Sequence, residues 1–177
     1  MKKRLIRIAI VLFLLLDLVI IGYLLQKKFV QPEKAHFHAG FHVYIDGKLQ
    51  DFSDTKYMET KPCNKDEGDK EKSPEELQKD KAHLHDNVGN VVHSHVRGGT
   101  WGDLFTNINF NIHPEKGITA YVSGKEVKNI LQYPIQPYDS AVILVGKHGD
   151  KATYLKNAVT RAAILQEEKN SESCGIP

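Results

Sequence analysis

The chain has 177 residues and a formal net charge of +2, which is enough for one domain with a modest core. The near balance of charge gives no electrostatic support for a nucleic-acid partner. The nine histidines are the compositional exception, because seven of them fall in the two windows 36–42 and 83–95.

The N-terminus predicts a membrane anchor over residues 5–25. The basic stretch MKKRLIR precedes an apolar run, Ile8–Leu25, that only Asp17 and Gly22 interrupt, and about 20 apolar residues cross a bilayer. Basic residues concentrate before the run, so the positive-inside rule places the N-terminus in the cytoplasm and the later residues outside it. A cleaved signal peptide is the alternative. Asp17 is either a tolerated, protonated acid or has a partner or a proton-linked role in the membrane.

This reading divides the chain into four parts. We expect a basic stub and transmembrane anchor (1–28), a juncture (29–35), an extracytoplasmic His-rich domain (36–148) with a charged insertion (59–81), and a C-terminal helix and tail (149–177). Outside the cytoplasm Cys63 and Cys174 can form a disulfide, which would close a loop of ~110 residues. Two free thiols are the alternative.

The stretch HFHAGFHVYI predicts a strand, because its apolar and polar residues alternate strictly. One face carries aromatic and aliphatic side chains and is the expected core face: Phe37, Ala39, Phe41, Val43 and Ile45. The opposite face carries His36, His38, Gly40, His42 and Tyr44. Asp46-Gly47 predicts a type I′ turn, with Lys48–Phe52 as the returning strand.

The charged insertion shows no binding motif and is expected to be solvated. A short helix is predicted near its end, since Ser73 suits the N-cap, Pro74 the first helical position and Glu76 the capping box.

The stretch HLHDNVGNVVHSH, residues 83–95, predicts a second hairpin. A three-residue turn with Gly89 in the left-handed conformation places His83 opposite His93. It then puts all four histidines on one face and Ala82, Leu84, Val92, Ser94 and Val96 on the other. A two-residue turn would split the histidines between the two faces. Asp86 serves the turn or, alternatively, accepts a hydrogen bond from His85.

Downstream, Thr100–Ile108 predicts a core-facing helix with Trp101, Leu104, Phe105 and Ile108 buried. Strands are expected at Ile118–Val122, Lys125–Val127 and Ser140–Gly146, and the last is apolar enough to be central. Asp150 can cap a final helix, whose buried stripe is expected to comprise Tyr154, Leu155, Ala158, Val159, Ala162 and Leu165.

The histidine pairs predict a metal site. Residues i and i+2 of a strand have parallel side chains with Cα atoms ~6.6–7 Å apart, and the chain offers this arrangement three times. The candidate ligands are His36, His38, His42, His83, His85, His93 and His95. Imidazole donors suit Zn(II) and Cu(II), and the absence of cysteine near the pairs disfavours a zinc finger. The alternative is a polar face whose histidines line a partner interface or respond to pH. His113 and His148 are isolated and read as ordinary surface residues.

A catalytic role is a further possibility. A His-x-His strand with a third histidine from another strand resembles the zinc site of carbonic anhydrases, although the resemblance covers only the ligand pattern. The chain shows no HExxH motif and no glutamate base among the histidines. No catalytic residue is therefore assigned, and a non-enzymatic function is favoured.

Three stretches, HFHAGFHVYIDGK, HLHDNVGNVVHSH and GTWGDLF, resemble an uncharacterised family of membrane-anchored, His-rich exported proteins. The order of elements is similar to small exported β-grasp modules related to the cobalamin-carrier C-terminal domain. The resemblance implies an α+β fold with a β-grasp-like mixed sheet, a short packing helix, an N-terminal transmembrane helix and a C-terminal helix. We expect a protein that captures, stores or delivers Cu(II) or Zn(II), with a protein partner in the envelope possible. The alternatives are a zinc-hydroxide hydratase or hydrolase and a metal-free interaction or pH-sensing protein.

Overall fold

The computed structural model describes residues 2–29, 33–60 and 72–171. Cys63 and Cys174 lie outside the described residues, and so does the predicted disulfide. The chain divides into two compact units, Met1–Glu33 and Lys34–Pro177.

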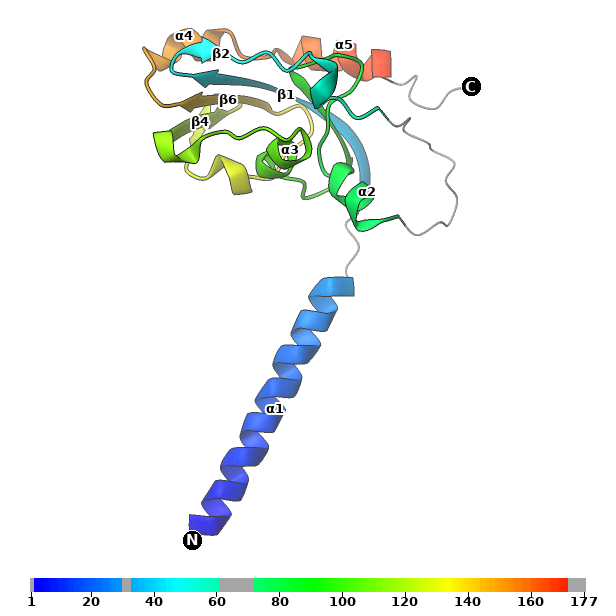
Figure 1. The fold of residues 1–177 in the computed structure, drawn as a ribbon, viewed down its shortest axis with the longest axis vertical. Helices are drawn as coiled ribbons and strands as arrows, with labels where there is room; N and C mark the ends of the chain where they lie inside the picture. Colours follow the sequence, from blue (N-terminus) through cyan, green and yellow to red (C-terminus); the bar gives the residue numbers. More distant parts are fainter. Residues whose placement is uncertain (1, 30–32, 61–71, 172–177) are drawn as a thin grey trace. The chain divides into compact units, whose positions relative to one another are not determined.

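The first unit is the helix α1, Lys2–Phe29 (Figure 1). Its described apolar side chains, such as Leu12 and Phe13, are exposed. Among the described residues, no helix combines the length and the apolarity needed to cross a membrane. The membrane anchor stays a prediction.

The second unit is a mixed α+β domain built on a curled sheet. Its strands are β1 (Lys34–Ile45), β2 (Lys48–Leu49), β3 (Val91–Val96), β4 (Ile118–Val122), β5 (Lys125–Val127) and β6 (Ser140–Val145). Its α-helices are α2 (Pro74–Lys79), α3 (Trp101–Asn107), α4 (Lys151–Lys156) and α5 (Arg161–Ser171). Short 3-10 helices span Thr55–Tyr57, Pro114–Lys116 and Ile130–Gln132.

The sheet runs in the order β2-β1-β6-β4-β5, and β3 pairs with β1 off this path. β1 is twelve residues long and has three partners: β3 lies antiparallel to its first half, while β2 (antiparallel) and β6 (parallel) pair with its second half. β6 is central and buried, as its apolar sequence predicts. β2 is shorter than predicted, although Asp46 and Gly47 both have the positive φ that a type I′ turn requires.

The two faces of β1 belong to different layers. The predicted core face packs with α3 in the main core, which contains Phe37, Ala39, Phe41, Val43, Trp101, Leu104 and Phe105. The other face of the sheet is covered by α4 and α5, which Figure 1 shows on the side opposite α3. The strict alternation in β1 therefore predicts the layers correctly.

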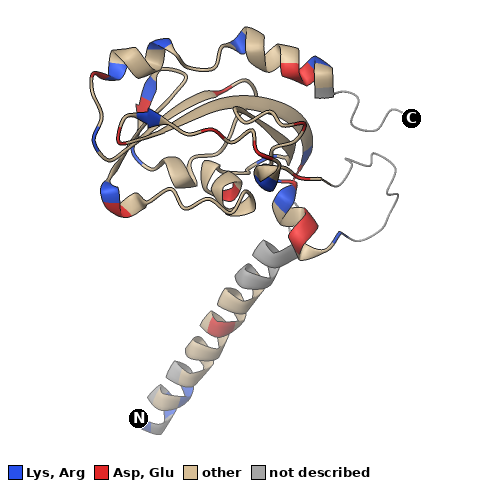
Figure 2. Cartoon of the chain, turned by 45° about the horizontal axis from the view of Figure 1, so that its top comes forward, with Lys and Arg blue, Asp and Glu red and all other residues tan. Residues whose placement is uncertain are grey.

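The predicted capping boxes are both present, at Ser73/Glu76 for α2 and at Thr100/Asp103 for α3. Asp103 also accepts hydrogen bonds from Gln78 and Lys81, at 2.9 and 3.1 Å. The end of the charged insertion is thus held against α3. Figure 2 shows acidic and basic residues interspersed over the helices and loops of this unit.

The predicted turn of the second hairpin is wrong in type. Asp86 and Asn87 take the left-handed conformation (φ 57° and 60°), and the amide of Val88 donates to the carbonyl of His85. Aspartate and asparagine tolerate this conformation. Gly89 is required for close approach instead, since a Cβ there would lie 2.4 Å from the backbone nitrogen of Ser53. His83 and Leu84 form isolated bridges rather than a strand, yet the predicted pairing of His83 with His93 is confirmed.

The single C-terminal helix that we predicted is broken in two. α4 begins after its predicted cap, Asp150, and ends at Lys156. Thr160 starts a new helix, because its hydroxyl accepts from the amide of Ala163. The break resets the helical phase, so that Ile164 is buried in place of the predicted Ala162 and Leu165.

Candidate metal centre

Three neighbouring backbone segments bring the histidines together. β1 supplies His36 and His38, β3 supplies His93 and His95, and the segment before the turn supplies His83 and His85. In the register of the sheet His38 pairs with His93, and on the other edge of β3 His93 pairs with His83. Because paired residues point to the same side of a sheet, three imidazoles stand in a row with His93 in the middle.

His93 is the centre of this histidine cluster, which comprises His36, His38, His83, His85, His93 and His95. Its ring centroid lies 4.4 Å from that of His38, 4.5 Å from that of His36 and 5.1 Å from that of His83. The rings of His85 and His95 lie 4.6 Å away. The side chain of His93 is fully buried, so five imidazoles surround a sixth that solvent does not reach.

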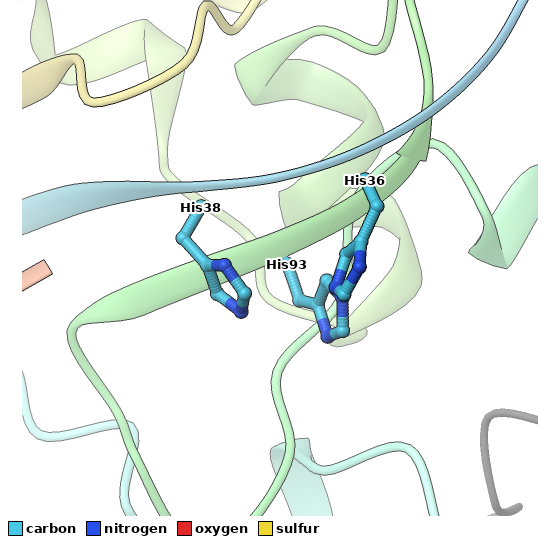
Figure 3. Close-up of side chains that lie close together, drawn as sticks. All are labelled: His36, His38 and His93. Carbon is cyan, nitrogen blue, oxygen red and sulfur yellow. The ribbon is translucent and has the colours of Figure 1, made fainter. Parts of the chain in front are cut away.

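The cluster contains two sets of three nitrogens that are close enough to hold one ion. In the β1 triad, His36, His38 and His93, the ligand atoms lie within 4.8 Å of one another. Figure 3 shows these three rings projecting to the same side from β1 and β3. The hairpin triad, His83, His93 and His95, meets the same distance. Both triads contain His93.

Two ring nitrogens in the cluster, Nε2 of His83 and Nε2 of His93, belong to rings whose Nδ1 makes a hydrogen bond. Nδ1 of His83 donates to the carbonyl oxygen of Lys79, 2.9 Å away at the end of α2. A neutral imidazole has one N–H, so Nε2 of His83 carries a lone pair. Nε2 of His83 and Nε2 of His93 are buried, and neither has a hydrogen-bond partner among the described residues. Leaving a buried polar atom unsatisfied costs about 1–3 kcal/mol, which a bound cation would recover.

Burial keeps the central imidazoles neutral. Desolvation, reinforced by the neighbouring histidines, lowers the pKa of His38 and His95 to about 4. Burial likewise lowers the pKa of His83 to about 4. Burial, reinforced by four neighbouring histidines, lowers the pKa of His93 further still. Neutral imidazole is the form that binds metals, so these four side chains are ready to act as ligands at pH 7.

The structure does not bring every predicted ligand into the cluster. His42 lies on the same face of β1, but its ring contacts that of Tyr44, at 6.2 Å between centroids. Burial lowers its pKa, and a bond to the backbone of Asn157 acts in the opposite direction. Of the histidines expected to be ordinary, His113 lies 3.0 Å from a carboxylate oxygen of Glu115, and His148 is exposed.

The structure adds groups that sequence reasoning missed or ranked low. Asp86, expected chiefly to form the turn, does so and also places a carboxylate oxygen 2.5 Å from Nδ1 of His85. The carbonyl of Lys79 comes from the insertion to which we gave no role. Glu168 of α5 lies 3.9 Å from Nδ1 of His38 and bonds to the hydroxyl of Tyr138. No local pattern points to Glu168, because 130 positions separate it from His38.

The donor set is made of imidazoles from a rigid sheet, which suits a borderline-soft divalent ion such as Zn(II) or Cu(II). Such a set can bind an ion firmly, and the lowered pKa values of four of its members keep those side chains neutral near pH 7: His38, His83, His93 and His95. In comparisons with known proteins, this chain matches no family model, no curated protein and no solved structure.

Proposed function

We propose that this protein binds Cu(II) or Zn(II) through the histidine cluster and serves metal capture, storage or delivery. The observation that carries the proposal is the environment of His93. Its ring is fully buried among five other imidazoles, and its Nε2 has no hydrogen-bond partner among the described residues. Burying the imidazoles in this way costs free energy, because they lose their hydrogen bonds to water. Binding a divalent cation would offset that cost.

The pKa values favour metal binding over pH sensing. A sensor that responds near pH 6–7 needs histidines that change charge there. His38, His83 and His95 have pKa values lowered to about 4, so they stay neutral across that range.

The proposed location is the outer side of a membrane, with residues 5–25 as the anchor. This part of the proposal rests on the basic N-terminus and the apolar run of the sequence. We also propose that the domain is a variant of the β-grasp fold. The order β2-β1-β6-β4-β5, with β1 parallel to the central β6 and α3 on the core face, supports it.

Metal content tests the function directly. The full-length chain, purified with a tag that contains no histidine, should carry Zn or Cu by elemental analysis and should bind either ion tightly in titrations. The double variant His113→Ala/His148→Ala should bind equally well, because both residues lie outside the cluster. A full-length chain that binds neither ion above the level of a chain lacking all six cluster histidines would contradict the proposal.

A hydratase or hydrolase that uses a metal-bound hydroxide is the second candidate. A small open pocket reaches the cluster, and its lining is His38, His85, Asp86, Val88, Val91, Glu167 and Asn170. Such an opening would let water and a small substrate reach an ion. CO₂ hydration or ester hydrolysis that disappears on chelation and returns with Zn(II) would support this candidate. A metal-loaded chain without either activity would count against it.

A further inference from the structure

Asp86, His85 and His93 form a chain of contacts that leads from the surface to the centre of the cluster. The carboxylate oxygen of Asp86 lies 2.5 Å from Nδ1 of His85, and Nε2 of His85 lies 2.5 Å from Nδ1 of His93. Asp86 is exposed, His85 is partly buried and His93 is fully buried. We call these three residues the relay.

The chemistry of the groups sets the direction of every bond in the relay. An ionised carboxylate only accepts hydrogen bonds, so Nδ1 of His85 must donate to Asp86. A neutral His85 then has a lone pair on Nε2, which accepts from Nδ1–H of His93. A neutral imidazole has a single N–H, and in the fully buried ring of His93 it is consumed in this bond. The remaining lone pair of His93 is therefore on Nε2, the buried atom without a hydrogen-bond partner among the described residues.

This assignment limits what the two triads can do. Both triads require a nitrogen of His93, and the relay leaves only Nε2 available to an ion. One lone pair forms one bond to a metal, so the β1 triad and the hairpin triad compete for the same atom. The alternative, an ion on each nitrogen of His93, requires the bond to His85 to be broken and the ring to lose its proton.

We propose that Asp86 and His85 are positioning residues that present His93 through Nε2 alone, so that the histidine cluster holds one ion at a time. The inference rests on the proposed metal-binding function and deepens it. An ion can be held by either triad, and His93 stays bound when the ion passes from one triad to the other. This arrangement suits a site that must accept an ion on one side and release it on the other.

Two substitutions at Asp86 separate its carboxylate from its part in the turn. Asp86 has a positive φ, which both asparagine and glycine tolerate. Asp86→Asn keeps an oxygen that can accept from His85, whereas Asp86→Gly removes the acceptor without straining the turn. Because the side chain is exposed, neither change disturbs the core.

The first measurement needs no metal. Long-range ¹H–¹⁵N correlation spectra of the metal-free, full-length chain at pH 8 report which nitrogen of each histidine carries the proton, and the His93→Leu variant identifies the signals of His93. We expect His93 to be protonated on Nδ1 in the wild type and in Asp86→Asn, and to show a mixture of both forms in Asp86→Gly. Protonation of His93 on Nε2 in the wild type would overturn the relay.

The second measurement is Zn(II) binding by titration and native mass spectrometry. We expect one ion per chain in all three proteins, with Kd close to the wild-type value in Asp86→Asn and about 10–100-fold weaker in Asp86→Gly. Two cluster-dependent ions per wild-type chain would overturn the one-ion inference but leave the metal-binding function intact. Equal affinity of Asp86→Gly and the wild type would overturn the positioning role. Binding of no ion would instead contradict the proposed function, while the spectra would still decide the relay.

Discussion

The two halves of β1 carry histidines on the same face but place them in different surroundings. His38 and His42 are four positions apart, roughly 13 Å along a strand. His38 lies beside the rings of His36, His85 and His93. His42 lies near Tyr44, and burial lowers the pKa of both histidines. The comparison teaches that a histidine whose pKa is lowered by burial does not by itself form a candidate metal site. The number of nitrogens that converge with it is what makes a site.

Gly40 marks the boundary between the two halves. A Cβ at this position would lie 2.6 Å from Cβ and Cγ1 of Val159, so the side chain of Val159, just before α5, occupies the space that a methyl group would fill. Beyond it, α4 packs over Tyr44 and its neighbours. The helix α4 thus covers the second half of the face, while α5 reaches the first half, where Glu168 lies 3.9 Å from Nδ1 of His38.

The largest difference should appear between leucine substitutions of His93, which pairs with the first half of β1, and of His42, which lies in the second half. His93→Leu should weaken Zn(II) binding by more than about 100-fold, because the residue shared by both triads is lost. His42→Leu should leave binding unchanged. The free energy of unfolding of the metal-free chain should change little in His93→Leu. Leucine removes the buried Nε2, which has no hydrogen-bond partner among the described residues. Urea denaturation with and without Zn(II) measures both effects, and equal loss of binding in the two variants would contradict the distinction.

The pH dependence of stability should be the next largest effect. Unfolded histidine has a pKa of about 6.5, whereas His38, His83 and His95 have folded values of about 4. Between these values the unfolded chain binds more protons, so the free energy of unfolding rises with pH. The metal-free chain should lose stability steadily as the pH falls from 6.5 towards 4 and should show little change above 7.

Denaturation at pH 8, 6 and 5 checks this expectation. The slope should be shallower in a His83→Gln/His95→Gln variant, because two of the depressed pKa values are removed. A stability that stays constant from pH 8 to pH 5 would show that these histidines are not buried as neutral groups.

Adding a single methyl group at Gly40 should lower the stability of the chain. Gly40→Ala should cost roughly 1–3 kcal/mol of stability, because the added Cβ overlaps Val159 and the packing of α5 must shift. The double variant Gly40→Ala/Val159→Ala should recover part of the loss, since it returns the space. Zn(II) stoichiometry should not change in either. A Gly40→Ala chain as stable as the wild type would contradict the close approach.

The smallest effect should come from His36, which lies at the exposed end of the β1 triad. His36→Ala should weaken Zn(II) binding by only about tenfold, because the hairpin triad remains complete. His42→Ala is the control on the other half of β1 and should have no effect on binding. Loss of all binding in His36→Ala would show that the hairpin triad cannot hold an ion by itself.

Much of this fold could be predicted because local patterns determine it. The alternation in residues 36–45 identifies the core face, and the capping boxes at Ser73 and Thr100 mark where two helices begin. The pairing of His83 with His93 follows from keeping the apolar residues on one face. The predicted type of the turn at Asp86 and the predicted single helix across the break before Thr160 were both wrong. Each feature depends on a distant packing partner. Gly89 must lie against Ser53, and the second part of the C-terminal segment must turn to bury Ile164.

The sequence by itself determined that the histidines of residues 83–95 share one side of the chain, opposite an apolar face, because side chains alternate along an extended backbone. Only the tertiary structure decided which of them meet. The register of β1 against β3 pairs His38 with His93 and makes His93 the centre, while α4 packs over the half of β1 that carries His42 and Tyr44. Contacts between segments far apart in the chain carry no local pattern, so neither the two triads nor the relay from Asp86 could be derived before the sheet was assembled.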